Sequence, residues 1–168
     1  MRLCSIVLFS VLALFAKDIT WETDKFLGEP FKMHEFEAEN FHATLVGYPF
    51  DSAKDSVSSR VPKAAVLYIH GFNDYFFQQE LAQQVDSAGY SFFAIDLHKY
   101  GRSYRSGETI GELRDISEYY AEIDSAISMI REAEGDSVPF VLMGHSTGGL
   151  IACLYAADRR NEIGRAHV

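Results

Sequence analysis

The sequence predicts a protein of the α/β class, with a mostly parallel sheet that carries helices on both faces. Three short apolar runs, rich in β-branched and aromatic side chains, cover residues 64–69, 90–95 and 138–143. A helical pattern follows each run, at 75–88, 110–134 and 149–157, so strand and helix alternate along the chain. This alternation is typical of parallel strands joined by right-handed crossovers.

Two further strands are expected before the first of these runs. Residues 31–50 alternate loosely between apolar and polar side chains, and Glu39-Asn40 separates the two halves as a turn. Residues 51–60 are polar and rich in serine, which indicates a surface loop.

The expected helices have recognisable ends. Asn73-Asp74 can cap the helix at 75–88, and Gly89 is placed to end it. Apolar side chains recur at helical spacing through 110–134, and Gly135-Asp136 follows them. Cys153 lies in the apolar last helix, so we expect a small buried side chain there.

Composition excludes some classes of function. The net charge is −9 and the isoelectric point is about 5.0, which argues against a nucleic-acid partner. The two cysteines, Cys4 and Cys153, form no CxxC pair and no cluster with histidine. The sequence therefore indicates neither a metal site nor a disulfide framework.

The N-terminus resembles a signal peptide or a membrane anchor, which we assign to residues 1–16. Arg2 precedes an apolar run that ends at Ala16, before Lys17. The run is too short to cross a membrane comfortably, and Leu14 is large for a cleavage site. We expect a secreted or membrane-tethered protein that can associate with a membrane surface. The alternatives are a misplaced start site or a buried N-terminal segment in a cytoplasmic protein.

The pentapeptide GHSTG, residues 144–148, matches G-x-S-x-G between a buried strand and a helix. A sharp strand-to-helix turn exposes the hydroxyl of Ser146, while Gly144 and Gly148 let the backbone pass closely. The start of the helix then points free N–H groups toward the serine. We therefore predict that Ser146 is a nucleophile. The alternative is a serine–threonine helix cap between two turn glycines.

A second motif, His70-Gly71-Phe72, ends the first buried strand. In a parallel sheet it lies at the same carboxyl edge as Ser146. Acyl transfer needs two N–H donors for the developing oxyanion, and the backbone N–H groups of Phe72 and Thr147 are the natural pair. Gly71 allows the loop to approach closely, and His70 shapes it.

Two other polar residues are expected to have structural roles. Asp96 follows the second buried strand, and we expect it to bind loop backbone around Gly101 rather than to act as a catalytic acid. His145 precedes the nucleophile, but neighbouring side chains at such a turn point in different directions. We expect His145 to support a loop rather than to act as the general base.

The motifs HGFNDY, DLHKYGRS and GHSTGG, in that order, resemble the lysophospholipase and monoacylglycerol-lipase-like branch of the α/β-hydrolases, which is often grouped with the serine aminopeptidases. The resemblance covers residues 21–161. It implies Ser146 as nucleophile and Phe72 and Thr147 as oxyanion donors, with no metal or organic cofactor. It also implies hydrolysis of carboxylic esters of acyl lipids or small alcohols. Serine aminopeptidase or thioesterase activity, and a catalytically silent binding protein, stay as alternatives.

The sequence departs from this family in one respect. The family's acid and histidine follow the nucleophile on later strands, whereas this sequence ends at Val168 and has only His167 after Ser146. We therefore interpret residues 17–161 as the N-terminal part of a hydrolase domain, inactive alone, with an unpaired apolar strand at the sheet edge. Residues 162–168 (EIGRAHV) match a translated sequencing adapter, GAG-ATC-GGA-AGA-GCA-CAC-GTC, which we interpret as read-through.

Overall fold

The computed structural model describes residues 19–49 and 61–159. The expected leader at 1–16, the polar loop at 51–60 and the adapter-like tail at 162–168 lie outside the described residues. Those three expectations therefore stay predictions.

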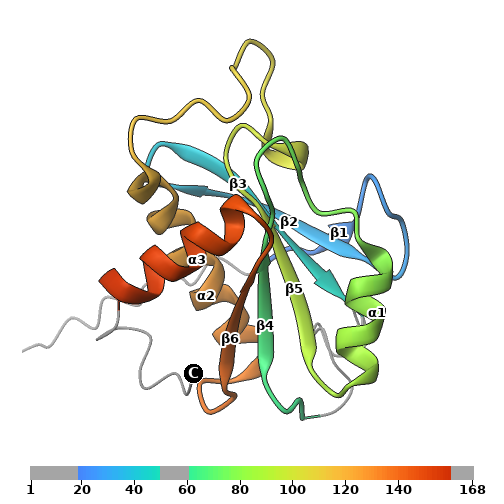
Figure 1. Ribbon diagram of the computed structural model, residues 1–168. Coiled ribbons are helices and arrows are strands. Elements are labelled where there is room, and N and C mark those ends of the chain that lie inside the picture. Colours follow the sequence, from blue (N-terminus) through green and yellow to red (C-terminus); the bar gives the residue numbers. More distant parts are fainter. Residues whose placement is uncertain (1–18, 50–60, 160–168) are drawn as a thin grey trace, which may run out of the picture.

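The described strands form one six-stranded sheet in the order β1-β2-β3-β5-β4-β6 (Figure 1). The first three strands and β5 pair in an antiparallel manner, whereas β4 lies parallel to both β5 and β6. The expected α/β class is confirmed, and the parallel part comprises the three runs that predicted it. The strands are β1 (Glu22–Thr23), β2 (Lys32–Ala38), β3 (Phe41–Tyr48), β4 (Ala65–Ile69), β5 (Ser91–Asp96) and β6 (Phe140–Gly144).

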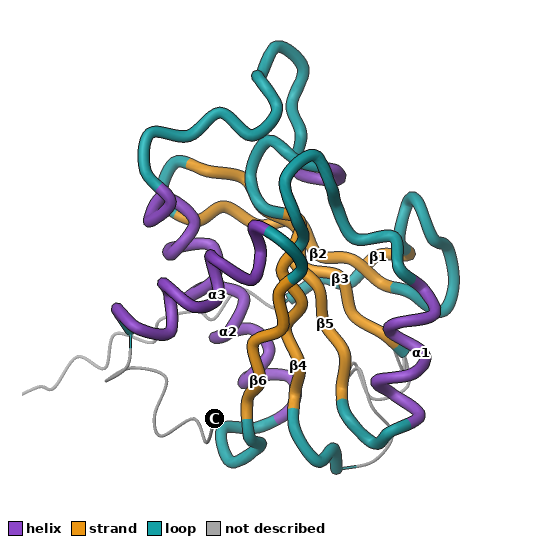
Figure 2. The backbone as a smooth tube through the Cα atoms, in the orientation of Figure 1, coloured by secondary structure: helices purple, strands orange, loops and turns teal. Residues whose placement is uncertain are grey.

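Helices cover both faces of the sheet, as predicted (Figure 2). Helix α1 (Gln79–Ser87) packs on one face, and α2 (Tyr120–Glu134) and α3 (Thr147–Asp158) pack on the other. Two short 3-10 helices, Gly101–Ser103 and Ile116–Tyr119, lie in the connection between β5 and α2.

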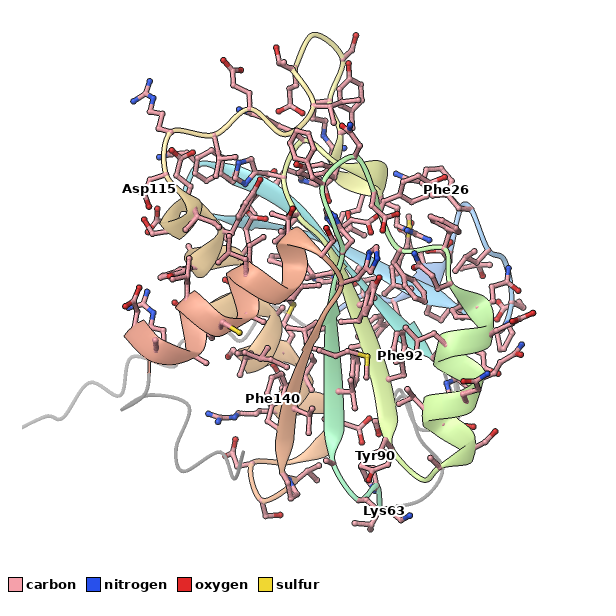
Figure 3. All side chains as sticks on the ribbon, in the orientation of Figure 1. Phe26, Lys63, Tyr90, Phe92, Asp115 and Phe140 are labelled. Atoms are coloured by element: carbon pink, nitrogen blue, oxygen red, sulfur yellow. The ribbon has the colours of Figure 1, made fainter. Side chains whose placement is uncertain are left out.

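The core has two halves because side chains of a strand alternate between its faces. Leu67 and Ile69 of β4 point toward α2 and α3. Val66 and Tyr68 pack on the α1 side, together with Phe92, which lies between β5 and α1 (Figure 3). All of these side chains are buried. Burial on both faces explains why these strands read as continuous apolar runs.

Two helix starts differ from the prediction. Helix α1 begins at Gln79 rather than at 75, because Asn73 has a positive φ of 54° and the Asp74 carboxylate accepts a hydrogen bond from the Tyr75 N–H without starting a helix. Helix α2 begins at Tyr120 rather than at 110. A capping box at Asp115 starts the preceding 3-10 turn there instead.

The predicted burial of the last strand and of Cys153 was wrong. Among the described strands β6 pairs only with β4, so it lies at the edge of the sheet, and Val141 is 40% exposed. The expected edge strand, which has no partner strand on its outer side among the described residues, is thereby confirmed. Cys153 is exposed because α3 buries its other face, where Ile151 and Tyr155 contact the core.

Within residues 19–49 and 61–159, no helix combines the length and the apolar character needed to cross a membrane.

Candidate active site

Ser146 occupies a sharp turn between β6 and α3. Its backbone has φ of 53° and ψ of −119°, a strained combination for a residue with a side chain. Two residues before Ser146 and two residues after it, only glycine fits. A Cβ on Gly144 would lie 2.4 Å from the backbone of Gly148, and a Cβ on Gly148 would lie 2.1 Å from the carbonyl oxygen of Ile69. The turn expected from the spacing of these glycines is present.

The turn leaves Ser146 exposed at the carboxyl edge of the parallel strands. Within the described part of the chain, its Oγ makes no hydrogen bond. The N–H groups of Phe72 and Thr147 likewise donate to no described group.

The loop after β4 reaches the serine through Gly71. A Cβ on Gly71 would lie 3.3 Å from Cβ of Ser146 and 3.3 Å from the carbonyl oxygen of His145. The motif at 70–72 and the motif at 144–148 therefore come together, as the sequence predicted.

His70 holds this loop in place through hydrogen bonds at both of its ring nitrogens. The N–H of Leu97 donates to Nε2 of His70 at 3.1 Å, and Nδ1 of His70 lies 2.8 Å from the carbonyl oxygen of Gly71. Because Nε2 accepts, Nδ1 carries the proton and donates. Burial lowers the pKa of His70, which keeps the ring neutral. The histidine thus ties the end of β4 to the end of β5.

The ring of His145 lies beside the Gly71 loop, with Nδ1 3.2 Å from the position of a Cβ added to Gly71. Its side chain is 66% exposed, and its Nδ1 lies 3.7 Å from a carboxylate oxygen of Asp74 in the loop before α1. This position fits the expected role in supporting a loop.

Asp96 hydrogen-bonds loop backbone, as predicted, and it does so within a buried cluster that the sequence did not predict. Its carboxylate accepts hydrogen bonds from the N–H groups of Phe76 and Arg102 and from Nη1 of Arg102, at 2.8, 2.9 and 2.8 Å. Arg102 also binds Asp24, with 2.9 Å between Nη2 and Oδ1. Burial acts to raise the pKa of Asp24, but the hydrogen bonds and charge of Arg102 outweigh it and the pKa is lowered. Asp96 is therefore structural, and it holds the turn at Gly101.

A pocket of about 100 Å³ opens beside the candidate oxyanion donors. Apolar and aromatic side chains form most of its wall, and sequence reasoning assigned several of them only to a helix or a polar loop. A larger depression of about 810 Å³ lies over Asp124, Arg131 and Tyr155, away from the serine turn. The small pocket is lined by His70, Gly71, Phe72, Leu97, Tyr100, Leu113, Ile116, Tyr119, Thr147 and Ile151.

Across residues 19–49 and 61–159, no group of three or more histidine, cysteine or acidic side chains could hold a metal ion.

The sheet order and the strand–turn–helix at Ser146 are those of an α/β-hydrolase. The sequence profile of the family described as "Serine aminopeptidase, S33" matches residues 60–167, and the chain belongs to this family. The matched range enters the segment that we interpret as adapter-derived, and that interpretation stays a prediction.

Relatives agree with the expected branch. The chain is 33% identical over 101 residues to "Phospholipase YtpA" of Bacillus subtilis, covering 60% of this chain and 37% of that protein. It is 28% identical over 134 residues to "Monoglyceride lipase" of Saccharomyces cerevisiae, covering 77% and 41%. The chain therefore spans well under half the length of these relatives.

Solved structures agree in fold. A thermostable carboxyl esterase from Bacillus coagulans superposes with a TM-score of 0.63 at 21% identity, covering 77% of this chain and 41% of that one.

Proposed function

We propose that the whole protein hydrolyses carboxylic esters of acyl lipids through an acyl-enzyme on Ser146. The observation that carries the proposal is the exposed Ser146 on its strained turn, with the Gly71 loop in contact with it. In this proposal the nucleophile and the two backbone donors act at one point, and the contact between the Gly71 loop and Ser146 supports it. The phospholipase and monoglyceride lipase names of the relatives support the substrate class.

The reaction has two stages. Oγ of Ser146 attacks the ester carbonyl, and its proton passes to a histidine outside the described residues. The N–H groups of Phe72 and Thr147 donate to the oxyanion. When the intermediate collapses, the alcohol leaves with that proton. Water then attacks the acyl-enzyme by the same route, and the carboxylic acid leaves while Ser146 regains its proton.

Aminopeptidase activity has less support from the pocket. A free substrate amine carries a positive charge and needs a carboxylate partner when it is buried. The small pocket has no acidic residue in its lining. An ester with an apolar acyl group fits it better.

A substrate panel tests the proposal. The whole protein, expressed from the longest open reading frame that contains this chain, is given a monoacylglycerol, a lysophospholipid, an acyl thioester and an aminoacyl amide. We expect turnover of the first two, and none by the Ser146→Ala variant. Faster hydrolysis of the amide or the thioester than of either ester would contradict the proposal. Ester hydrolysis that Ser146→Ala does not reduce would also contradict it.

A further inference from the structure

The pocket beside the oxyanion donors has a separate wall that comes from outside the regular elements. Residues 104–115 connect the first 3-10 helix to the second, and they supply Leu113 to the lining. Ile116, at the start of the next turn, continues this wall. Both side chains are partly buried and pack against the core beneath α2 and α3.

The wall approaches the opposite side of the pocket through Gly111. This glycine has a positive φ of 67°. A Cβ there would lie 2.5 Å from the hydroxyl oxygen of Tyr100 and 2.6 Å from Cε2 of Phe72. The backbone at 111 therefore rests directly on two aromatic rings. One of them belongs to the residue whose N–H we assign to the oxyanion.

The two rings that residue 111 contacts, those of Tyr100 and Phe72, differ in how tightly they are held. Tyr100 is buried, and its ring packs edge-on to His70 with 4.7 Å between the ring centroids. Phe72 is 56% exposed. Because Tyr100 is held in place, the distance of the wall from the pocket floor depends on how closely residue 111 can approach.

The wall has its own anchors. Nζ of Lys99 donates to the carbonyl oxygen of Glu112 at 2.6 Å. The Glu118 carboxylate accepts from the N–H groups of Arg114 and Asp115 at 2.9 and 3.2 Å. These bonds flank Leu113 on both sides, so its side chain is positioned against the pocket.

The side chains that line the pocket indicate which part of an ester substrate binds there. Both nitrogens of His70 are used by the backbone of Gly71 and Leu97, and apart from Tyr100, Tyr119 and Thr147 the other side chains of the lining are apolar. A glycerol or a headgroup would bury hydroxyl or charged groups with few partners there, which is costly. An acyl chain has no such requirement.

We propose that residues 104–115 form the specificity-determining wall of an acyl-binding pocket, with Leu113 as its contact residue and Gly111 as the position that sets its distance. The proposal rests on the proposed ester hydrolysis and extends it to the choice of acyl group. The described pocket of about 100 Å³ is smaller than a cavity of about 150 Å³ that holds benzene. Small changes in the wall should therefore alter which acyl chains the pocket accepts.

Chain-length preference of the whole protein tests this proposal. The readout is the ratio of kcat/KM for p-nitrophenyl decanoate to that for p-nitrophenyl acetate. Leu113→Ala widens the pocket and should raise the ratio about tenfold or more, and Leu113→Phe fills the pocket and should lower it by a similar factor. Gly111→Ala pushes the wall away from Tyr100 and should raise the ratio.

Gly107→Ala is the matched control for position 111. Gly107 lies in the same loop and also has a positive φ, 94°, but nothing lies within 4 Å of an added Cβ. The control therefore carries similar backbone strain without contact to the rings, and we expect its ratio to be unchanged. If Gly111→Ala does not fold, the two Leu113 variants decide.

The outcomes separate this inference from the proposed function. Ratios that stay unchanged in both Leu113 variants, with ester turnover retained, would overturn the inference alone. An equal shift in Gly107→Ala and Gly111→Ala would overturn the role of Gly111. No turnover of any ester by the unmodified protein would overturn the proposed function and the inference with it.

Discussion

Gly71 and Ser146 meet at the carboxyl edge of the sheet, where a side-chain carbon on Gly71 would lie 3.3 Å from Cβ of Ser146. Such a contact is tighter than most real ones, so the neighbours of an added methyl group must move. Gly71→Ala should therefore displace the Phe72 N–H relative to the nucleophile. We expect kcat of the whole protein on a monoacylglycerol to fall about ten- to a hundredfold. Steady-state kinetics measure it, and an unchanged kcat in a folded variant would contradict the contact.

The two adjacent glycines after the serine should respond in opposite ways. A Cβ on Gly148 would lie 2.1 Å from the carbonyl oxygen of Ile69, and backbone cannot easily move aside. A Cβ on Gly149 meets nothing nearer than 3.5 Å. Gly148→Ala should therefore prevent folding or destabilise severely, whereas Gly149→Ala should stabilise by about 0.5–1 kcal/mol. Urea unfolding compares them, and equal effects would refute the close approach of α3 to β4.

The turn at the serine could be predicted from sequence because its steric demands fix residue types at fixed spacing. Glycine is required at 144 and 148, and the apolar run before them marks the strand. The parallel pairing of β4 with β5 and β6 followed from the alternation of strand and helix. Such local demands leave a direct trace in the chain.

The pocket wall could not be predicted from a local sequence pattern of this kind. Tyr100, Leu113 and Ile116 come together through a loop with no period, whose course depends on Gly111 at a positive φ and on the cap at Asp115. The periodic pattern further along the chain made the whole stretch from 110 look helical. The edge position of β6 was expected, but its consequence for the exposure of neighbouring side chains was not.

The buried arginine cluster should contribute strongly to stability. Arg102 is fully buried between Asp24 and Asp96, so its loss leaves two buried carboxylates without a charge partner. Arg102→Met should lower the free energy of unfolding by about 3–5 kcal/mol.

Arg105 provides the comparison. Its side chain is 44% exposed and pairs with Glu35 at 3.3 Å. Arg105→Met should cost at most about 1 kcal/mol. Denaturant titrations of both variants measure the difference, and a loss of similar size at the two positions would contradict the account of the cluster.

His70 should make stability depend on pH. Burial lowers the pKa of this ring in the folded protein, so the unfolded state binds its proton more readily. The contribution of the neutral ring is complete above the unfolded value of about 6.5 and is lost as the pH falls below it. The free energy of unfolding of the unmodified protein should therefore fall toward that of a His70→Gln variant below this pH, by at most about 1.4 kcal/mol per pH unit. Urea titrations across the range measure the gap, and a gap that widens on acidification would contradict a neutral, buried ring.

Covalent labelling of Ser146 tests the central claim most directly. The folded whole protein is treated with a fluorophosphonate, and the site of the adduct is located by mass spectrometry of its peptides. We predict one adduct, on the peptide that contains Ser146, and none in the Ser146→Ala variant. A folded protein that stays unlabelled, or that carries its adduct on another residue, would contradict the assignment of Ser146 as the nucleophile and would favour a hydrolase-like binding protein.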